Sequence, residues 1–151
     1  MARIGREAGE IVRGSRVVLV ATLSPKEQSF MTPLWFVRDG GVLYLTSGTQ
    51  SWSGRNVAGH PAVTLLFGGE RGTASHRVVR LRGRATCETG SMPWRVLVRL
   101  ALKYYLAPRA LCAELTHVAL WPRRRRYRGQ GTGGAGYLRV VPTSAELLPL
   151  A

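Results

Sequence analysis

The chain has 151 residues and is 45% apolar, which suits one globular domain with its own core and argues against wholesale disorder. Its 22 basic and 8 acidic residues give a formal charge of +14, and a field of this sign attracts phosphates, anionic cofactors and nucleic acid. No apolar run approaches the roughly twenty residues of a membrane span, and the N-terminus lacks the apolar core of a signal peptide, so we expect a cytoplasmic protein without a membrane span.

The chain begins with a predicted short helix at 2–14 and then alternates strand patterns with turn signals. Proline has no backbone donor, so Pro33 places its strand at an edge or a bulge, and Asp39-Gly40 indicates a hairpin. We expect the last strand to be interrupted at Pro142. The predicted strands are 17–23, 29–37, 42–47, 62–68, 77–88 and 137–148. This order predicts a mainly β protein, with an antiparallel sheet that closes into a barrel or sandwich, in a single domain, 1–151.

Arginines occupy alternate positions of the predicted strand 77–88. Arg80, Arg82 and Arg84 alternate with apolar or small residues. Because successive side chains of a strand point to opposite faces, one face of this strand is expected to be buried and the other to carry the arginines.

The period changes to that of a helix at 92–108. Arg95, Arg99 and Lys103 recur every fourth residue and form one basic stripe on an otherwise apolar helix. We expect this helix to pack against the barrel or a second subunit, as part of a helical insert at about 92–117. A helix bound to a membrane surface is the alternative.

A basic, glycine-rich loop, 123–136, follows the insert and contains Arg123–Arg126 and Arg128. Three interpretations remain open: a solvated arm, a clamp for a polyanionic cofactor tail, and a nonspecific nucleic-acid patch. Its GQGTGGAG segment lacks the G-K-[ST] that a phosphate loop needs to ligate phosphate and magnesium.

The remaining chemistry is sparse. The three histidines show no ligand spacing, so no metal site is expected, and the carboxylates form no evident acid–base pair. Cys87 and Cys112 are expected to be small core residues. No catalytic residue is identified. The polar stretch 46–61, TSGTQSWSGRNVAGHP, is longer than a hairpin needs and is a candidate cradle for an anion.

Four stretches occur in a familiar order: VVLVATL, MTPLWFVRDGGVLYLTS, SWSGRNVAGHPAVTLLF and VVRLRGRATCE. In this order they resemble the FMN- and deazaflavin-binding split β-barrel family, which includes pyridoxamine 5′-phosphate oxidase and the flavin/deazaflavin oxidoreductases. The closing YLRVVPTSAEL is similar to that family's last strand, which commonly contains V-x-P-T. The resemblance implies a split β-barrel of about six to seven antiparallel strands. It also implies a homodimer with the cofactor in a groove at the subunit interface.

The resemblance also implies a set of site residues. The strand around 32–35 would run along the cofactor ring, and the end of the next strand would lie toward the ribityl chain and phosphate. A segment that usually reads S-x-K-x-R-N would grip the phosphate. The implied cofactor-binding residues are Thr32, Pro33, Leu34, Trp35, Thr46, Ser47, Ser51, Trp52, Ser53, Arg55 and Asn56.

One position departs from the family pattern, because Ser53 stands where the family has lysine. A charge-assisted hydrogen bond is about twice as strong as a neutral one, so phosphate binding should be weaker unless another cation substitutes. The candidate substitutes are Arg80, Arg82, Arg84 and the run at 123–128.

The function that the resemblance implies is hydride transfer to or from a small organic substrate, with the deazaflavin coenzyme F420 as cofactor and FMN as the alternative. The excess of arginine favours F420, whose tail is polyanionic. Two other classes remain open: a non-catalytic split barrel that binds a cofactor, haem or a hydrophobic ligand, and a basic nucleic-acid-binding module.

Overall fold

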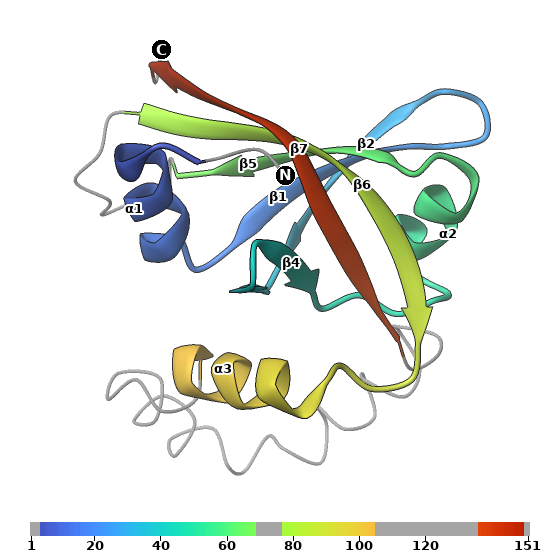
Figure 1. The fold of residues 1–151 in the computed structure, drawn as a ribbon. Helices are drawn as coiled ribbons and strands as arrows, with labels where there is room; N and C mark the ends of the chain where they lie inside the picture. The colour runs from blue at the N-terminus through green and yellow to red at the C-terminus, as the bar shows by residue number, and fades with distance from the viewer. Residues whose placement is uncertain (1–3, 69–76, 105–135, 150–151) are drawn as a thin grey trace, which may run out of the picture.

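One curled sheet of seven antiparallel strands dominates the described part of the chain, which in this computed structural model comprises residues 4–68, 77–104 and 136–149 (Figure 1). The strand order is β2-β1-β5-β6-β7-β4-β3. The strands are β1 (Val18–Leu23), β2 (Ser29–Leu34), β3 (Phe36–Asp39), β4 (Val42–Leu45), β5 (Ala62–Phe67), β6 (Arg77–Thr89) and β7 (Gly136–Pro149). The mainly β, split-barrel prediction is confirmed.

The two edges of the sheet are consecutive in the chain. β2 lies at one edge and β3 at the other, and only Trp35 separates them. The prediction of a single strand over 29–37 is therefore wrong, because the chain leaves one edge at Leu34 and joins the opposite edge at Phe36. The edge position predicted for Pro33 is confirmed. An edge strand tolerates proline since one side of its backbone needs no ladder partner.

The longest ladder joins β6 to β7 and contains a bulge. The register shifts between Arg82 and Gly83, and Gly83 pairs with Pro142. β7 continues through this point as one strand, and the interruption predicted at Pro142 takes the form of a bulge in its ladder. The irregularity is absorbed by the shift in register.

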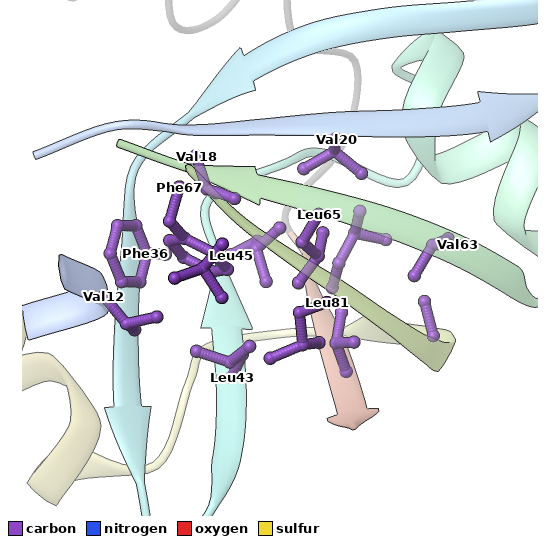
Figure 2. Close-up of a cluster of buried hydrophobic side chains, with 14 of the residues drawn as sticks. Val12, Val18, Val20, Phe36, Leu43, Leu45, Val63, Leu65, Phe67 and Leu81 are labelled. Carbon is purple, nitrogen blue, oxygen red and sulfur yellow. The ribbon is translucent and has the colours of Figure 1, made fainter. Parts of the chain in front are cut away.

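The core lies inside the curled sheet and follows the period of two predicted for strands. In β6, Val79 and Leu81 are fully buried, while Arg82 and Arg84 are exposed, as predicted. Figure 2 shows the inward side chains of several strands in one cluster, where the rings of Phe36 and Phe67 meet edge to face with centroids 4.9 Å apart. Burying each such large side chain contributes roughly 1.5–3 kcal/mol.

The helix α1 (Arg6–Gly14) packs on β6 and β7. It buries Ala8 and Val12, which join the core. After it, Ser15 donates a hydrogen bond to the carbonyl of Ile11 and accepts one from the backbone N–H of Gly68. The helix predicted at 2–14 is confirmed over its described part.

The helix α3 (Trp94–Tyr104) packs against the edge strand β3. Val96 is buried against Val37 and Met92. The opposite side of α3 is exposed and apolar, with Trp94, Leu97, Val98 and Leu102 on it. The prediction that this helix packs on the barrel is confirmed for one face. The rest of the predicted insert to 117, Cys112 and nearly all of the 123–136 loop lie outside the described residues.

Candidate functional site

Half of the stretch 46–61 is helical, because Trp52–Gly59 form α2. Ser51 is the N-cap: its Oγ accepts from the N–H of Gly54 at 3.1 Å and donates to the carbonyl of Gly48 at 2.6 Å. Ser47 Oγ lies 2.7 Å from Ser51 Oγ. Because Ser51 has one hydroxyl proton and uses it toward Gly48, Ser47 is the donor of this pair.

The first turn of α2 is in close contact with Gly48 and Thr49, in the segment that precedes it. A Cβ on Gly54 would stand 2.5 Å from the carbonyl oxygen of Gly48 and 3.1 Å from that of Thr49. Only glycine permits this approach, so Gly54 fixes the position of the segment that carries Thr46 and Ser47 relative to α2.

The side chains of α2 divide between two faces. Ser53, Asn56 and Val57 are at most 2% exposed, and their spacing of three and four residues places them on one face. The Asn56 Nδ2 donates to Thr22 Oγ1 at 3.0 Å, which ties α2 to β1. Trp52 and Arg55 are exposed on the other side. Of the predicted phosphate-binding residues on this helix, Arg55 faces solvent and Ser53 and Asn56 face the barrel.

The strand expected along the cofactor ring meets this helix. On β2, the ring of Phe30 stacks on that of Trp52, with centroids 6.1 Å apart and planes 4° from parallel. The guanidinium of Arg55 lies 5.9 Å from the centroid of Trp52, within cation–π range. The structure thus brings together Trp52 and Arg55 of the predicted set and adds Phe30, which sequence reasoning missed. The sequence feature that could have indicated Phe30 is an aromatic residue on a strand expected at a sheet edge.

Trp35 and Thr46 form the next contact along the site. Both the backbone N–H and the Oγ1 of Thr46 donate to the Trp35 carbonyl, at 3.0 and 3.4 Å. The indole of Trp35 also stacks on Tyr104 of α3, with centroids 4.5 Å apart. Thr32 and Leu34 lie opposite Val20 and Val18 of β1, on the side of the strand that faces the barrel.

A groove of about 510 Å³ opens on the outer face of the sheet, beside the start of β2. Leu23, Ser29, Arg82 and Arg84 contribute to its walls. Of the arginines expected to replace the family lysine, Arg82 and Arg84 are exposed in this groove, whereas Arg80 pairs with Glu146. The run at 123–128 lies outside the described residues.

Comparison with known proteins places this geometry in a family. A family model described as "Pyridoxamine 5'-phosphate oxidase" matches residues 4–121. The chain belongs to the pyridoxamine 5′-phosphate oxidase family. No curated protein matches the sequence.

Solved structures share the family fold at low sequence identity. A conserved hypothetical protein of Mycobacterium tuberculosis, Rv2991, is 20% identical, with a TM-score of 0.67 over 99% of this chain and 87% of its own. An F420 reductase is 18% identical, with a TM-score of 0.62 over 96% and 98%. The haem-storage protein HutZ of Vibrio cholerae is 12% identical, with a TM-score of 0.63 over 97% and 94%. These likenesses concern the fold.

Other reactive groups are few in the described part of the chain. Within 4–68, 77–104 and 136–149, no group of three or more His, Cys, Asp or Glu residues is placed to hold a metal ion. Burial, with a smaller effect of Glu88, raises the pKa of the Cys87 thiol, which packs against the core as predicted. None of the described helices combines the length and apolarity needed to cross a bilayer.

Proposed function

We propose that this protein is an F420-dependent oxidoreductase that transfers a hydride to a small organic substrate, with FMN as the alternative coenzyme. One observation carries the proposal: edge strand β2 and the first turn of α2 form a continuous aromatic and cationic surface. Phe30 stacks on Trp52, and the guanidinium of Arg55 lies over the same indole. Such a surface suits a ligand that joins a flat ring to an anionic chain.

The ring of a flavin or deazaflavin fits the residues of β2. In the described part of the chain β2 pairs only with β1, so the other side of its backbone offers N–H and C=O groups for hydrogen bonds. Phe30, Met31 and Trp35 are exposed apolar side chains beside that edge. Apolar contact and backbone hydrogen bonds together are what a heteroaromatic ring needs.

The residues of α2 satisfy a phosphate group less completely than β2 satisfies the ring, because α2 supplies one cation. Ser51 Oγ is committed to Gly54 and Gly48, and Ser53 is buried, so Arg55 is the charged group that α2 offers. Arg82 and Arg84 lie in the outer groove, on the face of the sheet opposite to the one that α2 contacts, so within one subunit they do not add to the charge of Arg55. The charge that offsets the missing family lysine would have to come from another arginine, of this subunit or of a second one.

The bound coenzyme would supply the hydride chemistry itself. The residues of the chain bind and orient it: β2 and Trp35 toward the ring, Thr46 and Ser47 toward the chain, and Arg55 toward the phosphate. Proximity and orientation account for most of what such a transfer requires, which agrees with the lack of an evident acid–base pair in the sequence.

We further propose a cytoplasmic homodimer with the coenzyme at its interface. Leu19, Leu23, Met31 and Pro33 alternate with inward residues and form an outer apolar patch across β1 and β2. Met31 is 54% exposed and Leu19 39%. Burial of such a patch against a second copy is favourable, and it lies beside the proposed ring surface.

The deciding experiment is a parallel titration of the protein with F420 and FMN, followed by coenzyme fluorescence. We expect F420 to bind more tightly. Arg55→Ala should raise its Kd by roughly tenfold or more, since a charged hydrogen bond contributes about 1.5–3 kcal/mol. Arg6→Ala, on α1 beside Glu10, is the control and should leave the Kd unchanged.

The result also separates the other classes. Binding of either coenzyme without turnover of any acceptor would support a non-catalytic binder. Salt-dependent retention of nucleic acid, with no effect of either coenzyme, would support a nucleic-acid-binding module. An unchanged Kd for Arg55→Ala would remove this residue from the phosphate site.

A further inference from the structure

A second groove lies between α1, β3 and α3. Its volume is about 570 Å³, and Val12 and Phe36 contribute to its floor while Gly9, Gly40 and Gly41 lie along its walls. Four cationic residues from these three elements also line it: Arg13, Arg38, Arg99 and Lys103. Among the residues that the structure describes, no acidic side chain lines the groove. This groove is called the α1–α3 groove below.

The groove is remote from the proposed phosphate site at Arg55, although Phe36 in its lining directly follows Trp35 of the proposed ring surface. Glu7 of α1 pairs with Arg77 at the start of β6. Pro61, which lies two residues after α2, accepts a hydrogen bond from the backbone N–H of Ala85, farther along the same strand. Eight residues of strand separate these points, or about 26 Å at 3.3 Å per residue. Figure 1 shows α1 and α2 near opposite ends of the curled sheet. An anion in this groove would therefore be a second ligand.

Two of the four cations are held in place by the open edge of β3. Arg99 Nη1 donates to the carbonyl of Arg38 at 3.1 Å, and its Nη2 lies 3.5 Å from Asp39. Lys103 Nζ donates to the carbonyl of Phe36 at 3.2 Å and lies 3.4 Å from the centroid of that ring. These contacts limit the freedom of both side chains, so less entropy is lost when an anion binds.

The other two cations have no carboxylate partner within the described ranges. Neither Arg13, in the last turn of α1, nor Arg38 forms a salt bridge there. The pair of Arg99 with Asp39 is the single ion pair of the cluster among those residues. Like charges that converge on one concavity repel each other, and an anion bound between them relieves that repulsion.

We propose that the α1–α3 groove binds a small molecule that bears phosphate groups. The planar donor forks of three arginines match phosphate oxygens, and the volume falls in the range of small-molecule sites. A concavity of this size between two helices suits a compact polyanion better than a nucleic-acid backbone, which needs an extended surface. The site is independent of the coenzyme that the proposed function requires.

The test uses a charge placed in the groove itself. A Cβ on Gly9 meets no atom within 4 Å, and Gly9 lies in a helix, so a longer side chain enters open space there. Gly9→Glu introduces an anion and Gly9→Gln is its neutral match in size. The probe is inorganic pyrophosphate, measured by calorimetry on the full chain at fixed ionic strength, with the melting temperature of each variant confirming the fold.

We expect the wild type and Gly9→Gln to bind pyrophosphate with similar Kd, and Gly9→Glu to bind it roughly tenfold or more weakly, because it supplies a competing carboxylate. Arg38→Gln should weaken binding comparably. Arg55→Ala should bind pyrophosphate as the wild type does, and F420 should not displace it.

Three results would overturn the proposal. The first is no binding of pyrophosphate by the wild type. The second is equal binding by the Glu and Gln variants. The third is retention of a DNA duplex that Gly9→Glu abolishes while pyrophosphate does not bind, which would make the groove a nucleic-acid surface. Failure of F420 to bind would leave the pyrophosphate result standing, so the two proposals fail separately.

Discussion

Asn56 of α2 and Thr22 of β1, which are 34 residues apart in the chain, share a buried hydrogen bond of 3.0 Å from Nδ2 to Oγ1. Both residues are at most 2% exposed. The bond attaches the helix of the proposed phosphate site to the inner face of the sheet. In this structure Asn56 therefore acts on the site by fixing α2, and its amide nitrogen is directed toward Thr22.

Thr22→Val should lower the free energy of unfolding by about 1–3 kcal/mol, because it leaves the buried amide of Asn56 without its acceptor. Urea denaturation of the purified protein measures the change. Thr86→Val, an exposed position on β6, is the matched control and should change stability by about 0.5 kcal/mol or less.

A double-mutant cycle of Thr22→Val with Asn56→Ala tests whether the two residues are coupled. The pair should destabilise by less than the sum of the single variants, since either change already breaks the bond. Strict additivity would show that the bond contributes nothing to the attachment of α2.

Tyr104 joins α3 to the start of β3 and to the segment before β1. Its hydroxyl accepts from the backbone N–H of Phe36 at 3.1 Å and lies 2.5 Å from the carbonyl of Arg16, while its ring stacks on Trp35. Tyr104→Phe keeps the ring and removes the hydroxyl. We expect a loss of about 1–3 kcal/mol, because the Phe36 N–H loses its acceptor and the Arg16 carbonyl its donor.

The control for Tyr104 is Tyr44→Phe, since the Tyr44 hydroxyl bonds to none of the residues in the described ranges and its ring packs beside Tyr137. That variant should stay close to the wild type in chemical denaturation. If both variants lost the same stability, the loss would not be specific to Tyr104. Its hydrogen bonds to Phe36 and Arg16 would then contribute nothing beyond the loss of a tyrosine hydroxyl.

The parts of the fold that follow from local periodicity were predictable. The alternation in β6 assigned Arg82 and Arg84 to the outside and Leu81 to the core because a strand has a period of two. The edge position of Pro33 followed from its missing donor. These features depend on neighbours in the sequence, and no distant contact is needed to infer them.

The parts that depend on distant partners were not predictable. Ser53 and Asn56 look like solvent-facing polar residues, yet Asn56 is buried because its partner Thr22 comes from β1. The turn from one sheet edge to the other at Trp35 depends on the closure of the whole barrel. The α1–α3 groove collects its four cations from three separated segments, so no short pattern of the sequence indicated it.

Cys87 should react slowly with thiol reagents at neutral pH. Burial, aided by the nearby charge of Glu88, raises the pKa of this thiol, and the thiolate is the reactive form. At pH 7 the folded protein therefore holds less thiolate than a free cysteine does, and the rate should rise as pH climbs toward the raised value. Alkylation by iodoacetamide in a Cys112→Ser background measures it. A rate at pH 7 equal to that of a free cysteine peptide would contradict the prediction.

Gly54 and Gly59 lie in the same helix and should respond in opposite ways to alanine. A Cβ on Gly59 meets nothing within 4 Å, so Gly59→Ala should stabilise the protein by about 0.5–1 kcal/mol through helix propensity and a smaller loss of chain entropy. A Cβ on Gly54 would stand 2.5 Å from the Gly48 carbonyl, which is backbone and must move. We expect Gly54→Ala to lose about 1–3 kcal/mol despite the better propensity of alanine.

The same displacement reaches the proposed site, because Gly48 also accepts the hydrogen bond of Ser51, and Ser51 contacts Ser47. Gly54→Ala should therefore raise the Kd for F420, although it changes no charge, while Gly59→Ala should leave it unaltered. Thermal denaturation and the coenzyme titration, performed on both variants, provide the two measurements. Stabilisation by both alanines would mean that the segment 46–51 does not rest on the first turn of α2. A loss of stability at Gly54 with an unchanged Kd would show that this contact supports the fold without positioning the coenzyme.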